Sequence, residues 1–299
     1  METATIDPDA PVPIRAARGA RRSSPLDYAT VVVPLDGSPA AERALPVARW
    51  LARRLDAQLH AVIADVPPTE AEWYRRYADE LEGRHPGLTV GRTGDPDVVK
   101  IVGDVAARLG PALVCLATHG WSGGGPHVGP TYAALAAASP GPLVAVGEQA
   151  RPGVDDAAAR IVACVDGTAA AEAVLPAAAR WARGLGAALS IVTVAQPAGR
   201  PLVPGSRQWP AHGPADPDAY LDRLVDRPEV AGLDVDGTVL WSGVRPHVAL
   251  AEHLRDHPAT LVAVAAHPRT GPARLVAGGG EAARIIETSP VPVLVQPVG

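Results

Sequence analysis

Several features are scarce in this chain of 299 residues, and each absence excludes a class of protein. It has no phenylalanine, one methionine and only two cysteines. Cys115 and Cys164 both lie inside apolar runs, where cysteine behaves as a small buried hydrophobic residue. Two such residues indicate neither a disulfide framework nor a cysteine-based metal site. We therefore expect free, buried cysteines and no metal centre.

Long apolar runs and a strong net charge are also missing. No apolar stretch free of proline, glycine and charge reaches the length that crosses a membrane. A net charge of -5 argues against a nucleic-acid groove or a basic membrane surface. Residues 1–27 hold clustered arginines but no apolar signal-peptide core, which predicts a disordered tail. The expectation is a soluble, cytoplasmic protein without nucleic-acid or membrane partners.

What the chain does contain is a repeat. Residues 30–38 end in Asp36-Gly37-Ser38, and residues 160–168 end in Asp166-Gly167-Thr168 after a similar β-branched run. Both copies continue through Ala-Ala-Glu, Leu-Pro and Arg-Trp, and both end in Ser-Pro-x-Pro before a last apolar segment. A repeat of this period predicts two similar domains, at 28–149 and 158–299, with a linker at 150–157.

Hydrophobic patterns alternate between strand and helix within each copy. The expected strands of the first half are 30–35, 59–64, 88–90, 113–117 and 143–146, with helices from the N-cap Ser38 to Leu55, at 70–81 and 97–109, and from about 130. The second half repeats the order with strands 161–165, 189–194, 235–240, 260–265 and 293–295 and helices up to about 185 and at 247–253. Ser38 is the expected N-cap, and Pro46 predicts a kink or a late helix start. This alternation predicts an α/β fold with a doubly wound parallel sheet.

Candidate ligand groups follow two strands of each half. Ligands of a doubly wound sheet bind beyond the carboxyl ends of the strands, where the strand order reverses. Asp36 and Asp166 end the first strand of each half, and each either caps the following helix or contacts a ligand. The loop after the fourth strand, residues 117–129, is rich in glycine, so its N–H groups can surround a phosphate.

Catalytic signatures are weak. His119 and His267 close the fourth strand of each half, but no cysteine or carboxylate stands near them at metal-ligand spacing, so we expect a structural role. No nucleophile elbow, Walker loop or Cys-x-x-Cys motif is found in the sequence. We expect no catalytic residue and no enzymatic activity.

These features together resemble the universal stress protein family in its tandem, two-domain form. The carriers are Asp-Gly-Ser/Thr after the first strand, the Gly-x-x-Gly loop, a glycine before the last helix, and Pro-Val-Leu-Val at the end. The resemblance implies five parallel strands in the Rossmann-like order 3-2-1-4-5 in each half, and a role in stress response or regulation. It also implies ATP as ligand, with Mg²⁺ accompanying it. ATP-binding members hold adenosine between strands one, two and four, and cradle the phosphates with Gly, two residues, Gly, nine residues and Gly-Ser/Thr.

The first half departs from this phosphate pattern at two positions. Ala117 replaces the leading glycine, and Pro130 follows Gly129 where a hydroxyl residue is expected, with Thr131 as its substitute. Ala117 adds a methyl group at a close approach, and Pro130 removes one N–H donor. The nucleotide-binding residues that the resemblance implies here are Pro34, Leu35, Asp36, Asp65, Ala117, Gly120, Gly129, Pro130 and Thr131.

The second half departs further. Ala265 and Pro268 replace both leading glycines, and no hydroxyl residue follows the closing pair. The degenerate site consists of Val165, Asp166, Val194, Ala265, Gly279 and Gly280. One lost charge-assisted hydrogen bond costs about 1.5–3 kcal/mol, or roughly one to two decades of affinity. We therefore expect weak ATP binding in the first half and essentially none in the second.

The sequence leaves other functions open. An interaction module of the same fold without a nucleotide is the main alternative, and a nucleotide hydrolase is the last. A homodimer and an unidentified protein partner are further alternatives. The last strands, 143–146 and 293–295, are expected to bring the halves together, because copies of the family meet there and a bare strand edge invites pairing.

Overall fold

The computed structural model describes residues 26–120, 128–139, 141–154, 159–195, 214–266 and 280–298. The first half contains β1 (Thr30–Leu35), α1 (Pro39–Glu42), α2 (Ala44–Leu55), β2 (Gln58–Ile63), a 3-10 turn (Pro68–Glu70), α3 (Ala71–Arg84), β3 (Leu88–Arg92), α4 (Val98–Leu109), β4 (Ala112–Ala117), α5 (Pro130–Ala138) and β5 (Leu143–Val146). The second half contains β6 (Arg160–Val165), α6 (Ala169–Glu172), α7 (Leu175–Leu185), β7 (Ala188–Ala195), α8 (Pro217–Val225), a 3-10 turn (Pro228–Val230), β8 (Val235–Trp241), α9 (Pro246–Asp256), β9 (Leu261–Ala266), α11 (Glu281–Thr288) and β10 (Val293–Pro297).

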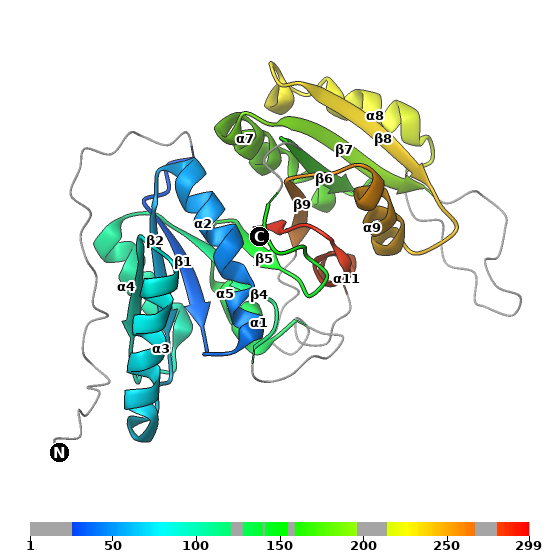
Figure 1. Cartoon of the computed structure of the whole chain (residues 1–299). Coiled ribbons are helices and arrows are strands. Elements are labelled where there is room, and N and C mark those ends of the chain that lie inside the picture. The colour runs from blue at the N-terminus through cyan, green and yellow to red at the C-terminus, as the bar shows by residue number, and fades with distance from the viewer. Residues whose placement is uncertain are drawn as a thin grey trace, which may run out of the picture.

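The strands form one sheet of ten, in the order β3-β2-β1-β4-β5-β10-β9-β6-β7-β8 (Figure 1). Pairing within each half is parallel, and each half has the order 3-2-1-4-5. The predicted fold class, two doubly wound five-stranded domains in tandem, is therefore confirmed.

The two halves meet through their last strands, as predicted. β5 and β10 pair antiparallel, with Val144 opposite Leu294, and both side chains are fully buried. Across the same junction, Arg54 donates to the carbonyl of Leu185 at 3.0 Å. Strand pairing through a buried seam joins the halves into one continuous sheet.

Two boundaries differ from the sequence expectation. Leu26, placed in the tail, is buried, and Arg180 donates to its carbonyl oxygen. Ala150, the first residue of the expected linker, is also buried. Both residues therefore belong to the folded part, whereas residues 1–25 and 155–158 lie outside the described residues.

Helices cover both faces of the sheet. One core layer joins β1 and β2 to α2 and α3, and β6 and β7 to α7 and α8, and includes Trp50 and Trp181. Two further layers, on the opposite side of the strands, join them to α4, α5, α9 and α11. Burial on both faces explains why the strands read as continuous apolar runs without alternation.

Local sequence signals explain where the first helices begin. Ser38 caps α1, because its side-chain oxygen accepts from the N–H of Ala41 at 3.0 Å, as predicted. The chain then breaks at Arg43, and α2 begins at Ala44 with Pro46 in its first turn. The late start predicted from Pro46 is confirmed, since an N–H in the first turn has no intrahelical acceptor.

Helix α8 was not predicted from the sequence. This helix carries clear signals: Asp216 accepts from the N–H of Ala219, and Pro217 stands at the first helical position. Tyr220 and Leu224 then point to one buried face with helical spacing. The proline- and glycine-rich composition of residues 196–217 predicts a long loop that is either functional or disordered, and the helix begins at the end of that segment.

Two further expectations concern the burial of the cysteines and the presence of membrane-spanning helices. Cys115 is fully buried, and its thiol lies 3.8 Å from the carbonyl oxygen of Ala44. Cys164 is only half-buried, so the expectation of burial was wrong there; both cysteines are free. Among the described residues, no helix combines the length and apolarity needed to cross a membrane.

Candidate functional site

A pocket of about 280 Å³ lies at the carboxyl ends of β1, β2 and β4 in the first half. The first-half residues assigned from the sequence all line it: Pro34, Leu35, Asp36, Asp65, Ala117, Gly120, Gly129, Pro130 and Thr131. This space is lined by five separate segments of the chain, within residues 34–41, 62–65, 96–98, 116–120 and 129–132. The doubly wound sheet brings them together because its strand order reverses between β1 and β4.

Asp36 shapes the turn that follows β1. One carboxylate oxygen accepts from the N–H of Ser38 at 2.9 Å, and Ser38, not Asp36, caps α1. The capping role considered for Asp36 is therefore wrong. Gly37 adopts a φ of +84°, and a side chain there would meet the ring of Trp73 on α3, so the turn requires glycine. The second oxygen of Asp36 faces Gly120.

Gly120 and Gly129 allow close approach of the backbone. A Cβ atom at Gly120 would lie 2.0 Å from Oδ2 of Asp36. At Gly129, it would lie 3.0 Å from the carbonyl oxygen of Thr118, which already accepts the Gly129 N–H at 2.7 Å. Both positions that match glycines of the phosphate pattern thus lack room for a side chain.

The N-terminus of α5 forms one end of the pocket. Gly129 is its N-cap and supplies no side-chain acceptor, Pro130 takes the first helical position, and the first turn contains no acidic residue. The first N–H groups of a helix have no intrahelical acceptor, and the helix dipole is positive there. This end of the pocket therefore favours an anion.

Carboxylates line the pocket at the ends of β1 and β2. Asp65 adopts a φ of +53°, and its N–H donates to the carbonyl oxygen of Asp95 at 3.0 Å. Burial raises the pKa of Tyr74, and nearby carboxylates, including Asp36 and Asp65, add to the shift. The pocket is thus polarised, with negative side chains at the ends of β1 and β2 and helix N–H groups at α5.

His119 is held by protein groups. It is buried, and its Nδ1 lies 2.9 Å from Oγ1 of Thr118 and 3.5 Å from a carboxylate oxygen of Glu148. These contacts agree with the expected structural role. Its counterpart His267 lies outside the described residues. Within the ranges that the structure covers, no group of three or more His, Cys, Asp and Glu could hold a metal ion.

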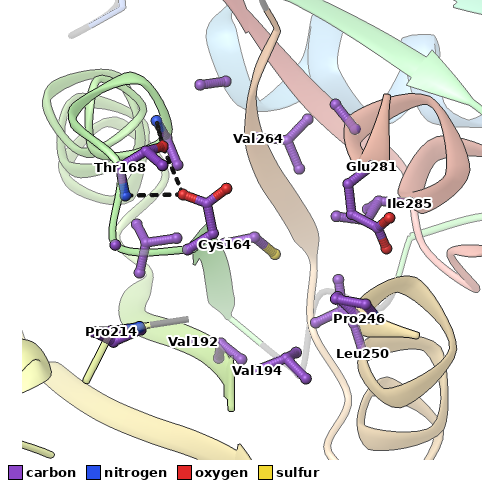
Figure 2. Close-up of a pocket in the computed structure, with 16 residues that line it drawn as sticks. Cys164, Thr168, Val192, Val194, Pro214, Pro246, Leu250, Val264, Glu281 and Ile285 are labelled. Carbon is purple, nitrogen blue, oxygen red and sulfur yellow. Dashed lines mark hydrogen bonds between the residues drawn. The ribbon is translucent and has the colours of Figure 1, made fainter. Parts of the chain in front are cut away.

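The second half has a larger pocket, of about 530 Å³, at the ends of β6, β7 and β9 (Figure 2). Of the degenerate site residues, four line it: Val165, Asp166, Val194 and Ala265. Gly280 caps α11 without lining the pocket, and Gly279 lies outside the described residues. Asp166 repeats the role of Asp36, since it accepts from the N–H of Thr168 at 3.0 Å.

Among the lining residues of the second-half pocket that were not assigned from the sequence, two have ionisable side chains. Cys164 lies in the middle of the space, and Glu281 stands at its far wall (Figure 2). Glu281 directly follows the N-cap Gly280, so its position in the first turn of α11 could have been predicted from the sequence. Its Oε1 accepts the N–H of His247 at 2.7 Å and lies 2.8 Å from the His247 Nδ1.

Comparison with known proteins matches the chain to one family twice. The sequence profile of the Universal stress protein family matches residues 27–147 and again residues 158–297. The chain belongs to the universal stress protein family. Among curated proteins, none matches this universal stress protein significantly.

Solved structures support the tandem fold of this universal stress protein. A universal stress protein from Archaeoglobus fulgidus has a TM-score of 0.60 at 16% identity, covering 90% of this chain and 96% of that one. A functionally unknown protein from Pseudomonas aeruginosa has a TM-score of 0.56 at 14% identity, covering 92% and 95%. A universal stress protein in complex with cAMP covers 46% of this chain and 94% of its own, at 24% identity and a TM-score of 0.35. The first two neighbours, at 16% and 14% identity, show a likeness of the fold alone.

Within this shared fold, the two halves of the universal stress protein differ at the helix that faces the pocket. The first turn of α5 is free of acidic residues, whereas α11 begins with Glu281. The pockets also differ in size: the aromatic ring of Tyr132, three residues after the α5 cap, lines the smaller one. The residue three after the α11 cap is Ala283.

Proposed function

We propose that this universal stress protein acts in stress response or regulation by binding ATP in the first-half pocket, without turnover. The observation that carries the proposal is the polarity of that pocket. Carboxylates of Asp36 and Asp65 stand at the strand ends, and the N-terminus of α5 lines the same pocket. A ligand with hydrogen-bond donors at one end and anionic groups at the other, as in a nucleotide, matches this arrangement.

The adenosine part would lie at the carboxylate end. Ribose hydroxyls and the adenine amino group are donors, and carboxylate oxygens accept from them. The apolar side chains of Leu35, Val62 and Leu116 line the same pocket and supply contacts for the base. Ligand sites commonly combine such apolar walls with a few placed polar groups.

The phosphates would lie over Gly120 and Gly129, at the start of α5. Both glycines leave the backbone open at points where a Cβ would collide with protein atoms. Backbone N–H groups at a helix N-terminus are a common site for phosphate. Pro130 offers no N–H, and one missing charge-assisted hydrogen bond costs about 1.5–3 kcal/mol, so the affinity should be weak.

Mg²⁺ would arrive with the nucleotide. Mg²⁺ is commonly bound by one or two carboxylates together with waters and substrate phosphates. Asp36, whose Oδ2 lies beside Gly120, supplies such a carboxylate, but the part of the chain that the structure describes holds no complete metal site of its own. The protein's residues therefore fit a metal that the phosphates bring with them.

A substitution at Gly120 tests the proposal. Gly120→Val should abolish ATP binding measured by calorimetry, since even its Cβ would lie 2.0 Å from Oδ2 of Asp36 at the pocket wall. The matched control is Gly280→Val, because Gly280 caps the equivalent helix and a Cβ there meets nothing within 4 Å. The control variant should bind ATP like the wild type. An equal loss of ATP binding in both variants would contradict the assignment of the ATP site to the first-half pocket.

One observation favours the alternative, an interaction module without a nucleotide. The pocket volume of about 280 Å³ lies at the lower limit of ligand sites, which range from about 300 to 1,000 Å³. If calorimetry detects no heat of binding at millimolar ATP, this alternative is favoured. In that case, the protein partner would be sought by cross-linking in cell extracts, and we propose the cytoplasm as its compartment.

A further inference from the structure

The second-half pocket has an apolar interior. Its inner wall is built from side chains that are almost completely buried: Val192, Leu250, Val264 and Ile285. Cys164 lies among them, and burial raises the pKa of its thiol to about 12, so the sulfur stays neutral at pH 7. A neutral thiol is a soft apolar contact. The volume of about 530 Å³ falls inside the range of small-molecule sites.

The rim of this pocket carries two exposed carboxylates, Asp166 and Glu281. Glu281 is already hydrogen-bonded to His247 through Oε1. Asp166 uses one oxygen, Oδ1, for both the N–H and the hydroxyl of Thr168, at 3.0 and 2.6 Å. Its second oxygen takes part in neither bond. Among the described lining residues, there is no lysine or arginine.

A phosphate is disfavoured where Glu281 stands. Negative charge is stabilised at a helix N-terminus, and the carboxylate of Glu281 already occupies the first turn of α11. A second anion beside it would be repelled by a like charge at short range. The same position at α5 is occupied by Pro130, which has no charge.

We propose that the second-half pocket binds a compact apolar molecule carrying one ammonium group, and does not take the nucleotide. The apolar body fills the space lined by Val194 of β7 and Ile285 of α11 (Figure 2). The ammonium group lies at the rim and donates to Asp166. Because the two pockets lie in different halves, this ligand and ATP bind independently, and the chain has two sites of different chemistry.

The test uses three indole ligands whose side chains end in groups of different charge. Tryptamine is cationic, tryptophol is neutral and indole-3-propionate is anionic. Calorimetry with the full chain should show binding of tryptamine, roughly two- to fivefold weaker binding of tryptophol, as expected for the loss of one exposed ion pair, and no measurable binding of indole-3-propionate. Saturating ATP should leave the tryptamine isotherm unchanged.

Two variants locate the site. Asp166→Asn keeps an oxygen that can accept from Thr168, so the turn should survive, and it should bind tryptamine and tryptophol equally. The matched control, Asp65→Asn in the other pocket, should bind tryptamine like the wild type.

Equal or tighter binding of indole-3-propionate would overturn the inference, as would equal binding of all three ligands by the wild type or no binding of any. If ATP displaces tryptamine and Asp166→Asn weakens ATP, the second half is the nucleotide site; this overturns the inference yet retains nucleotide binding. If the wild type binds tryptamine as expected but does not bind ATP, only the proposed function is refuted.

Discussion

Gly147→Val is expected to destabilise the junction between the halves by about 3 kcal/mol or more, because it forces atoms together in a packed region. Gly147 follows β5, and a Cβ atom there would lie 2.0 Å from the carbonyl oxygen of Ile286 in α11. That carbonyl is backbone of the other half, so it cannot rotate away as a side chain would. The helix or the β5–β10 seam must shift.

Thermal unfolding measures this effect. A loss of about 3 kcal/mol should lower the midpoint by roughly 6 °C. Gly141→Val is the control, since Gly141 precedes the same strand and a Cβ there meets nothing within 4 Å. An equal, small shift in both variants would show that the junction tolerates a side chain at Gly147, and that the two halves are less tightly coupled than the seam indicates.

Acid should destabilise the protein through His60, which lies fully buried on β2. Burial lowers its pKa to about 4, from the usual 6.5. Its Nδ1 lies 2.6 Å from Oγ1 of Thr89, and Nε2 has no partner among the described residues. Protonation would place an unpaired charge in the core.

The lowered pKa of His60 sets the pH range in which the stability of the fold changes. Between pH 6.5 and about 4, the unfolded chain binds a proton at this histidine and the folded chain does not, so stability falls as the pH falls. The difference between 6.5 and about 4 corresponds to about 3 kcal/mol at 1.36 kcal/mol per pH unit. Above pH 6.5 the contribution is complete and constant.

Comparison with His60→Leu isolates this contribution from the carboxylates that titrate in the same range. Denaturant unfolding at pH 7 and at pH 4 should show that the wild type loses about 3 kcal/mol more than His60→Leu does. Parallel losses in the two proteins would mean that His60 is protonated in the fold or reached by water.

The fold could be read from the sequence because its evidence is local and repeated. The Asp-Gly-Ser turn after β1 and the Asp-Gly-Thr turn after β6 each fix a strand end and a helix start within a few residues. The apolar ends of the two halves likewise indicated the β5–β10 junction. Helix α8 was missed because the composition of the segment before it outweighed the short signal from Asp216 onward.

The candidate sites were only partly readable because their shape depends on long-range contacts. The glycine pattern identified Gly120, but not that its constraint is the carboxylate of Asp36, which is 84 residues earlier in the chain. In the second half, the lost glycines indicated a degenerate nucleotide site, whereas the structure shows a larger apolar pocket there. The positions of Cys164 and Glu281 beside that pocket follow from the packing of β6, α9 and α11.

The number of ATP molecules bound per chain tests the central claim most directly. Native mass spectrometry of the full chain titrated with ATP should show one bound nucleotide, and none in Gly120→Val. The polarised pocket beside α5 accounts for the single site, and Glu281 at α11 for the absence of a second. Two equally occupied sites per chain, or one site that survives Gly120→Val, would contradict the account.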